Sequence, residues 1–594
     1  MSRPSASLKE YKTLIPYIAR YRIQYVFGLV CLIIVDAAQI AIPQFIRKAV
    51  DLISNGNFQW RQIITLSLYM AGVMAVVSGG RFLWRYFISG SSRRIETQLR
   101  ENLYSHLQTL SWDFYQKNKI GDIMARSITD IQAVRMSVGM GVVAFFDFVF
   151  MSTAILIIIF VQDARSALVS IIPLPLVSAL ILLFGNLVGK KFRVAREAYS
   201  KLSDNAQETF AGIRVIKSFV KEWWFIKKFA DSGEDYREAN MQLVRLFGFF
   251  FPFIQFLSGF TVLIMLAIGG MRVINGLMTP GSLVSMFQYL NMLIWPLMGA
   301  GFMVNMIQRG AVSLGRINEI FNTPPSIKDS ESTSLISPSD SIPALELSGL
   351  TFSYNDTNTA LDGITLKVNR GEWLGIMGRT GSGKSTLIKT FTRMIDPPPG
   401  SVRIFGIDAR DWPLEELRKL FAVSPQDSYL FSDSIANNIS YGFDGTDTRK
   451  SGEVEKAVVF ASLDKDLALF QNGKDTLVGE RGMTLSGGQK QRTAIARAFI
   501  MGSEFLVLDD SLSAVDNETE RKILEALRKE RHGRTTIIIS HRVSTLKYAD
   551  KVLVLDNGKT LEYGSPELLA KQGGFYGRMA ALQKLEPRTE TENV

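Results

Sequence analysis

The segment GRTGSGKS, at residues 378–385, constrains the fold of this chain more than any other segment. The apolar run WLGIM precedes it, which predicts a buried strand that leads through a glycine-rich loop into a helix. In such a loop the glycines let backbone amides turn toward phosphates, while Lys384 can reach the β and γ oxygens and the Ser385 hydroxyl can ligate Mg²⁺. The segment therefore predicts an α/β domain that binds ATP with Mg²⁺. The predicted phosphate-binding residues are Gly378, Arg379, Thr380, Gly381, Ser382, Gly383, Lys384, Ser385 and Thr386.

A second apolar run, FLVL at residues 505–508, ends in two carboxylates, Asp509 and Asp510. In nucleotide hydrolases a carboxylate at the end of a buried strand beside the phosphate loop holds Mg²⁺. We therefore expect Asp509 to bind the metal ion together with Ser385.

The segment LSGGQKQR, at residues 485–492, lies between these two motifs. The order and spacing of the three resemble the ATP-binding cassette (ABC) family, and the resemblance extends over essentially the whole chain. It implies that Tyr354 stacks on adenine, that Gln426 senses Mg²⁺ or water, and that His541 is the switch histidine. SAVD at residues 513–516 resembles the family's D-loop. LSGGQKQR resembles the family's signature, which would cap ATP held on a second cassette; the signature residues are Ser486, Gly487, Gly488 and Gln489.

Apolar residues make up 47% of the 594-residue chain, and their long runs lie before about residue 310. Six stretches are long enough to cross a bilayer core of about 30 Å as helices of about 20 residues. They lie near residues 22–46, 62–86, 138–162, 165–189, 245–272 and 281–307. The sequence predicts a multidomain chain, in which an all-α transmembrane domain of six helices is followed by an α/β P-loop ABC nucleotide-binding domain.

Proline and serine are frequent between residues 322 and 344, where no periodicity is sustained, and this is typical of a linker. The predicted division is a transmembrane domain, a linker, a nucleotide-binding domain and a polar tail, at residues 1–322, 323–344, 345–585 and 586–594.

Lysine and arginine gather in two long segments between the predicted spans, at about residues 87–137 and 190–244. The positive-inside rule places such segments in the cytoplasm. We expect both termini and the nucleotide-binding domain on that side of a bacterial inner membrane. This distribution accounts for the net charge of +11, so no nucleic-acid partner is expected. The single cysteine, Cys31, excludes a disulfide framework within the chain.

Both long segments are predicted to extend beyond the bilayer as helices. Residues 114–131 resemble the first intracellular loop of ABC exporters, with Gly121 and Asp122 opening a short transverse helix, and residues 205–219 resemble the second loop. The resemblance implies that both loops couple ATP use to movement of the transmembrane helices. Taken alone, each segment is equally compatible with a solvated amphipathic helix.

Asp510 departs from the family pattern, in which a glutamate at this position activates the attacking water. Aspartate is shorter by one carbon–carbon bond, about 1.5 Å, and a misplacement near 1 Å can lower a rate about a hundredfold. We expect this site to bind ATP and to hydrolyse it slowly. An intact signature beside a weakened site resembles one subunit of the heterodimeric multidrug-type ABC exporters that have one degenerate ATP site, and this resemblance implies a non-identical partner that supplies the glutamate. The alternatives are a homodimer with Asp510 as a slow base and an ATP-gated regulatory membrane protein.

Two carboxylates, Asp36 and Asp147, lie within predicted spans. Because a charge at the bilayer centre costs about 2.5–3.5 kcal/mol on insertion scales, a functional role is the first hypothesis. The alternative is that each carboxylate lies near a membrane interface or pairs with a nearby arginine such as Arg81 or Arg85. The last two spans are rich in phenylalanine and methionine, which suit an adaptable apolar cavity, although packing or lipid contact also explains them. With the family resemblance, these features predict export of amphipathic or hydrophobic substrates, such as drug-like molecules or lipids.

Overall fold

The computed structural model divides the chain into two compact units. Unit 1 comprises Met1–Thr109 and Asn118–Pro324, and unit 2 comprises Leu110–Lys117 and Pro325–Val594. Residues 330–341 of the predicted linker and the whole predicted tail, 586–594, lie outside the described residues. The structure describes residues 8–56, 59–171, 173–329, 342–355, 358–442 and 450–585.

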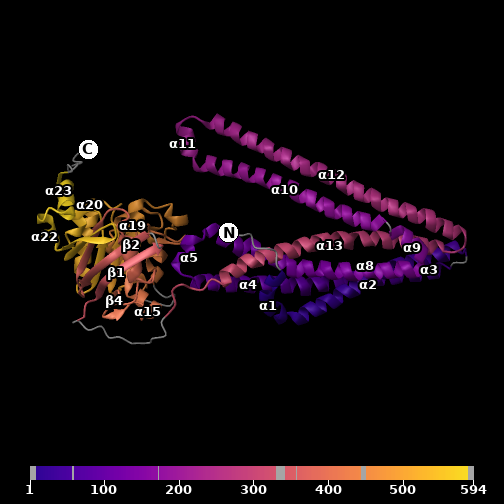
Figure 1. The fold of residues 1–594 in the computed structure, drawn as a ribbon, viewed down its shortest axis with the longest axis horizontal. Helices are drawn as coiled ribbons and strands as arrows, with labels where there is room; N and C mark the ends of the chain where they lie inside the picture. Colours follow the sequence, from indigo (N-terminus) through magenta and orange to yellow (C-terminus); the bar gives the residue numbers. More distant parts are fainter. Residues whose placement is uncertain are drawn as a thin grey trace. The chain divides into compact units, whose positions relative to one another are not determined.

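Unit 1 is helical throughout its described part (Figure 1). Its N-terminal elements are η1 (Leu8–Leu14), α1 (Ile15–Arg20), α2 (Arg22–Ser54), α3 (Trp60–Trp84), η2 (Arg85–Ser89) and α4 (Gly90–Thr109). The chain returns through α6 (Ile120–Ala125), η3 (Arg126–Asp130), α7 (Ile131–Met136), η4 (Ser137–Gly141) and α8 (Val142–Gln162). The remaining helices are α9 (Ala164–Ile171), α10 (Pro173–Ala211), α11 (Ile213–Ser218), α12 (Glu222–Ile274) and α13 (Pro280–Phe321).

Within the described residues, four helices are long and apolar enough to cross a membrane. They contain the first, second, third and sixth predicted spans, and they run over Arg22–Ser54, Trp60–Thr109, Ile120–Gln162 and Pro280–Phe321. The fourth predicted span falls on α9 and the start of α10, where residue 172 and many side chains lie outside the described part. The fifth falls on α12, which contains the shorter apolar stretch Gly259–Ile274.

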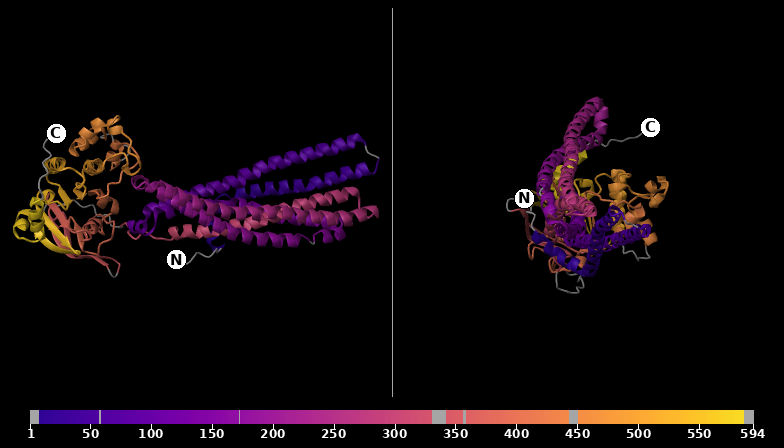
Figure 2. Two further views of the ribbon diagram at one scale, coloured as in Figure 1. Left: turned by 90° about the horizontal axis from the view of Figure 1, so that it is seen from above. Right: turned by 90° about the vertical axis from the view of Figure 1, so that its right-hand side faces the viewer.

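Figure 1 shows that the α10–α12 hairpin diverges from α13 and α8 toward its α11 tip, and Figure 2 gives two further views of the long helices. Helix α2 packs against α3, α8 and α13, and α10 pairs with α12 along their length. Gly212 immediately precedes α11, the short helix that joins α10 to α12. The second predicted intracellular loop therefore lies at the tip of a long helical hairpin.

The first intracellular loop differs from the expectation. Its separate short helix is α5 (Trp112–Lys117), whereas Gly121 and Asp122 lie in α6, where the chain already returns. Helix α5 belongs to unit 2, because Leu110 is buried there and the Ser111 hydroxyl accepts a 3.0 Å hydrogen bond from the amide of Ile327. These contacts hold the short helix at Trp112–Lys117, which precedes Gly121 in the sequence.

Unit 2 contains two sheets. The antiparallel sheet has the order β2-β1-β4-β5, and the larger sheet has the order β10-β9-β3-β8-β7-β6, parallel except for β10. The strands are β1 (Leu345–Asn355), β2 (Asn358–Val368), β3 (Trp373–Gly378), β4 (Val402–Ile404), β5 (Ile407–Asp408), β6 (Phe421–Ser424), β7 (Phe505–Asp509), β8 (Thr535–Ile539), β9 (Lys551–Asp556) and β10 (Lys559–Gly564).

Helices flank these sheets in unit 2. They are α14 (Lys384–Phe391), α15 (Leu414–Lys419), α16 (Ile435–Ile439), η5 (Ser440–Gly442), α17 (Lys450–Phe460), α18 (Asp464–Leu469), η6 (Gly473–Asp475), η7 (Glu480–Gly482), α19 (Gly487–Ile500), α20 (Asn517–Glu530), α21 (Val543–Leu546), α22 (Pro566–Lys571) and α23 (Phe575–Leu585). A helical transmembrane region followed by an α/β nucleotide-binding domain confirms the predicted fold class.

The parallel strands β3, β7 and β8 lie next to one another and are almost wholly buried, as expected of strands covered on both faces. Ile539 at the end of β8 pairs both with Ile376 of β3 and with Asp509 of β7. Because parallel strands end at one edge of the sheet, the phosphate loop at residues 378–385, Asp509, and His541 just after β8 emerge there together.

Candidate nucleotide-binding site

A cavity of about 450 Å³ opens at this edge of the sheet in unit 2. Its lining brings together predicted site residues from five separate segments: Tyr354, Thr380–Thr386, Gln426, Asp509 with Asp510, and His541. Gly378 and Arg379 lie just before the lining residues of the loop. Further lining residues are Thr359, Ala360, Ile539, Asn557 and Gly558.

The phosphate loop depends on two glycines with left-handed backbone angles. Gly381 has φ +82° and Gly383 has φ +101°. A Cβ at Gly383 would lie 2.5 Å from the carbonyl oxygen of Ala360, so that a side chain is excluded by space as well as by conformation. Gly383 immediately precedes α14, and the tight turn therefore aims the first amides of α14 at the cavity.

Lys384 is held against this loop. Its ammonium group donates hydrogen bonds of 2.7 Å and 2.8 Å to the carbonyl oxygens of Gly378 and Arg379. Burial lowers the pKa of Lys384, and the nearby carboxylates of Asp509 and Asp510 partly oppose that shift. The cation is thus fixed at the wall of the cavity, within the segment that would surround the phosphates.

Ser385 and Asp509 form the part of the site that fits Mg²⁺. The Ser385 hydroxyl donates to a carboxylate oxygen of Asp509 across 3.4 Å, and Gln426 lines the same cavity. Burial raises the pKa of Asp509, and the neighbouring Asp510 raises it further. Among the described residues, no group of three His, Cys, Asp or Glu side chains could hold a metal by itself. This donor set suits Mg²⁺, which is commonly held by one or two protein oxygens together with substrate phosphates and water.

Asp510 has an unusual backbone conformation, with φ +46°. Its amide donates a 3.0 Å hydrogen bond to the carbonyl of Ile539, and its own carbonyl accepts a 2.8 Å bond from the Ser513 hydroxyl. Left-handed residues other than glycine are uncommon, and they persist where the surroundings hold them. Burial raises the pKa of the Asp510 carboxyl, whereas the nearby side chains of His541, Lys384 and Arg542 lower it.

Comparisons with known proteins agree with this geometry. Residues 25–297 match the family model described as the ABC transporter transmembrane region, and residues 361–513 match the model described as ABC transporter. Over 95% of its length, the chain is 36% identical to the probable multidrug resistance ABC transporter ATP-binding/permease protein YheI of Bacillus subtilis, 96% of which is covered. The chain belongs to the ABC transporters.

Two further similarities connect this ABC transporter to a lipid flippase and to a solved exporter structure. It is 30% identical to the ATP-dependent lipid A-core flippase of Syntrophus aciditrophicus, over 98% of this chain and 96% of the flippase. A solved structure of a bacterial Atm1-family ABC exporter with ATP bound superposes with a TM-score of 0.76 and 26% identity, over 97% of this chain and 100% of that chain.

The signature segment of this ABC transporter lies outside the cavity. Ser486 caps α19: its hydroxyl accepts from the amide of Gln489, while the Gln489 side chain accepts from the Ser486 amide at 2.9 Å. Gly488 packs closely, since a Cβ there would lie 2.9 Å from the Ala514 carbonyl oxygen. The cavity lining therefore does not include Ser486, Gly487, Gly488 or Gln489.

Sequence reasoning missed the contribution of the turn between β9 and β10. The amide of Gly558 donates a 3.2 Å hydrogen bond to the Ser382 carbonyl, and Asn557 lines the cavity beside it. Both turn residues have positive φ, which matches the Asn-Gly signal of a tight hairpin. That signal predicts the turn, but not its approach to the phosphate loop.

Unit 1 of the ABC transporter contains a second cavity, of about 650 Å³. Asp36 and Asp147 both line it, as do Arg81 and Arg85. Asp36 is 1% exposed, and one of its carboxylate oxygens has no hydrogen-bond partner among the described residues. The apolar lining includes Met140, Met151, Met292, Met298, Met306, Trp84, Trp295 and Phe302. The last predicted span, near residues 281–307, contributes Met292, Met298, Met306, Trp295 and Phe302 to this lining.

Proposed function

We propose that this chain uses ATP to export amphipathic or hydrophobic compounds, as one subunit of an ABC exporter dimer in a bacterial inner membrane. The observation that carries the proposal is the unit 2 cavity, which gathers Lys384, Asp509 and His541 at one sheet edge. Relatives named as a multidrug resistance transporter and a lipid A-core flippase support the substrate class. The positive-inside pattern supports termini and a nucleotide-binding domain in the cytoplasm.

Each cavity residue has a proposed task toward ATP. Tyr354 is exposed at the cavity, so its ring can stack on adenine, and its hydroxyl lies 3.2 Å from that of Thr386. Lys384 and the loop amides bind the β and γ phosphates. Ser385, Asp509 and Gln426 would hold Mg²⁺, whose charge would offset that of the phosphates. Gln426 and His541 orient the attacking water and the γ-phosphate.

A second subunit is supported by two features. The signature residues Ser486–Gln489 lie outside the cavity of their own chain, which suits a segment that closes on another chain's ATP. At the tip formed by α11, large apolar side chains are exposed, including Phe210 (75%), Phe219 (71%) and Trp223 (72%). Exposed apolar clusters of this kind mark protein contact surfaces. The tip therefore suits docking on a partner subunit.

We further propose that the partner is not identical to this chain. The shorter carboxylate of Asp510 weakens this chain's own site, whereas its signature is intact. A partner with glutamate at the corresponding position would form the productive site with Ser486, Gly487 and Gly488 of this chain.

The cavity of unit 1 supports an amphipathic substrate. Methionine side chains adapt to different shapes, and the buried, unpaired oxygen of Asp36 offers one polar contact in apolar surroundings. A substrate with an apolar body and a hydrogen-bond donor fits this combination.

The test is purification on a tag carried by this chain alone, followed by identification of the proteins that copurify and reconstitution into vesicles. We expect a second ABC subunit in equal amount and ATP-dependent accumulation of an amphipathic dye. Accumulation that is equal with ATP and with a non-hydrolysable analogue would refute export. Full transport by this chain in the absence of any other subunit would refute the non-identical partner.

A further inference from the structure

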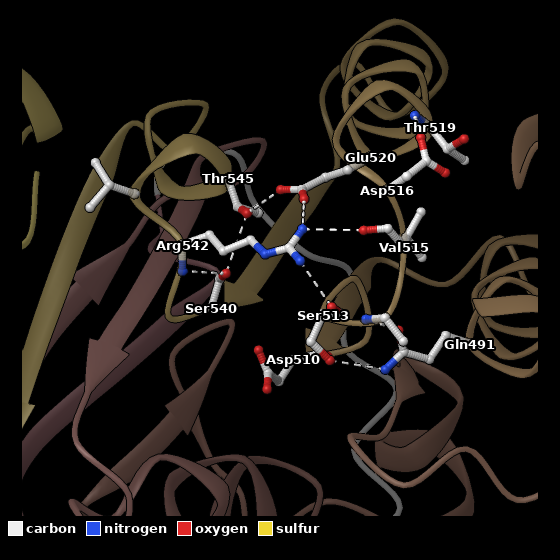
Figure 3. A network of polar contacts seen from close by, with 12 residues as sticks. Gln491, Asp510, Ser513, Val515, Asp516, Thr519, Glu520, Ser540, Arg542 and Thr545 are labelled. Carbon is white, nitrogen blue, oxygen red and sulfur yellow. Dashed lines mark hydrogen bonds and ion pairs between the residues drawn. The ribbon is translucent and has the colours of Figure 1, made fainter. Parts of the chain in front are cut away.

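Arg542, the residue after His541, lies at the centre of a polar network in unit 2 (Figure 3). Its guanidinium donates a 2.9 Å hydrogen bond to the carbonyl of Ser513 and a 3.2 Å bond to that of Val515. Both acceptors belong to the D-loop, residues 513–516. The backbone of Arg542 is fixed as well, because its amide donates a 3.0 Å bond to the Ser540 hydroxyl.

A buried carboxylate holds this guanidinium in place. Glu520, in the first turns of α20, is 3% exposed and forms an ion pair with Arg542. Its second oxygen accepts a hydrogen bond from the hydroxyl of Thr545 in α21. Because an ionised carboxylate without partners is costly to bury, Glu520 needs both contacts. The position of Arg542 is therefore determined from α20 and α21 together.

On its other side, the D-loop is joined to the signature helix. The Ser513 hydroxyl donates to the Asp510 carbonyl at 2.8 Å and accepts from the side-chain amide of Gln491 at 3.1 Å. The side-chain oxygen Oε1 of Gln491 accepts a 2.8 Å bond from the backbone amide of Ala514. Gln491 belongs to α19, the helix that Ser486 caps.

These contacts form a continuous path between two functional segments of one chain. The path begins at His541 in the nucleotide cavity, passes through Arg542 to the D-loop, and reaches α19 through Gln491. We infer that Arg542 is a positioning residue that couples this chain's nucleotide site to its signature helix, and so to the ATP bound by the partner subunit. The inference rests on the proposed function.

The guanidinium suits this task better than an ammonium would. Its planar fork bonds two backbone carbonyls and one carboxylate at the same time. A lysine at this position would keep the charge beside Glu520, but its single ammonium cannot span the three acceptors in this geometry. Arg542→Lys therefore separates the positioning role from the charge that the fold requires.

The experiment measures steady-state ATP hydrolysis by the complex that copurifies with this chain. We expect Arg542→Lys to lower kcat by about 10- to 100-fold, with KM for ATP changed by less than about threefold. The matched control is Arg528→Lys, since Arg528 of α20 also bonds a carbonyl and a carboxylate, those of Tyr548 and Asp550, but does not contact the D-loop. The control should keep kcat within about twofold of the parent.

Ser513→Ala supplies an independent measurement, because Ser513 is exposed and its loss leaves the core intact. We expect it to lower kcat too, and we expect the double variant with Arg542→Lys to be little slower than the slower single variant. If Arg542→Lys lowers the unfolding temperature so far that no complex is recovered, the kcat of Ser513→Ala alone tests the inference.

Three results would overturn the inference. They are an unchanged kcat in Ser513→Ala or Arg542→Lys, a change confined to KM, and losses that multiply fully in the double variant. An unchanged kcat would mean that the network serves only this chain's own slow site. A parent complex without ATPase activity would refute the proposed function itself, and the two failures are therefore distinguishable.

Discussion

The hydroxyl of Ser385 donates a hydrogen bond across 3.4 Å to a carboxylate oxygen of Asp509, joining the start of α14 to the end of β7. The two residues are far apart in sequence. They meet because β7 pairs with β8, which pairs in turn with β3, the strand that leads into the phosphate loop. This relationship places the two proposed Mg²⁺ ligands beside the phosphate loop.

The buried carboxyl of Asp509 predicts a pH effect on stability. Burial raises its pKa above the ordinary value of 3.8, so the folded chain binds this proton more tightly than the unfolded chain does. The nucleotide-free protein should therefore lose stability as pH rises from about 4 through the raised pKa of Asp509. Asp509→Asn should reduce this loss, because only the part that comes from Asp510 remains, and it should also abolish the additional stabilisation by ATP with Mg²⁺. Thermal unfolding over this pH range checks both, and an unchanged pH slope in the variant would contradict the first.

Lys384→Ala should weaken ATP binding by about 10- to 100-fold, because it removes charge-assisted hydrogen bonds to the phosphates. Titration with a fluorescent ATP analogue measures the change. Lys522→Ala is the matched control, since Lys522 is an exposed lysine of α20 that pairs with Glu518. If Lys384→Ala and the control bind the ATP analogue with equal affinity, Lys384 does not contribute to nucleotide binding.

The sequence predicted the parts of the site that depend on local chemistry. The glycines of the phosphate loop, Lys384 and Asp509 each belong to a motif in which residue type and spacing follow from the task. Strand pairing then brings the motifs together. The length and hydropathy of the helical segments predicted the membrane region for the same reason, because both are local properties.

Other features depend on packing between distant segments, which the sequence pattern does not contain. The bond from Arg542 to Glu520 requires α20 and α21 to lie together, and Glu520 alone resembles any helical glutamate. Similarly, the contacts of Ser111 with Ile327 decide that α5, rather than the segment at Gly121, forms the separate short helix.

The contacts of α5 predict where coupling can be broken. The Trp112 ring lies 6.0 Å from the ammonium of Lys389, which belongs to the phosphate-loop helix α14. Trp112→Ala should abolish stimulation of ATP hydrolysis by substrate, while the affinity for ATP stays within about twofold of the parent. Asp122→Asn is an informative comparison, because Asp122 pairs with Arg126 inside unit 1. If both variants keep full stimulation, neither segment transmits the signal.

Asp36→Asn should alter the stimulation of ATP hydrolysis by substrate without altering the basal rate of hydrolysis. The change keeps the shape of the side chain in the unit 1 cavity and replaces a carboxyl oxygen with an amide nitrogen. We expect a lower apparent affinity for an amphipathic stimulator of ATP hydrolysis, with basal hydrolysis within about twofold of the parent. Asp204→Asn, at an exposed position of α10, is the matched control. Identical stimulation curves for both variants would exclude Asp36 from substrate binding.

The position of Asp510 makes the sharpest prediction about the dimer. Its backbone is fixed by bonds to Ile539 and Ser513, so a shorter side chain cannot be compensated easily by movement of the main chain. If the partner supplies a glutamate, removing that glutamate should nearly abolish hydrolysis, whereas Asp510→Ala should lower it by less than about threefold. Asp510→Glu should raise turnover only if the partner's signature can close on this site. Steady-state ATPase activity of the purified complex distinguishes these cases. An equal loss of activity from Asp510→Ala and from removal of the partner's glutamate would refute an asymmetric dimer.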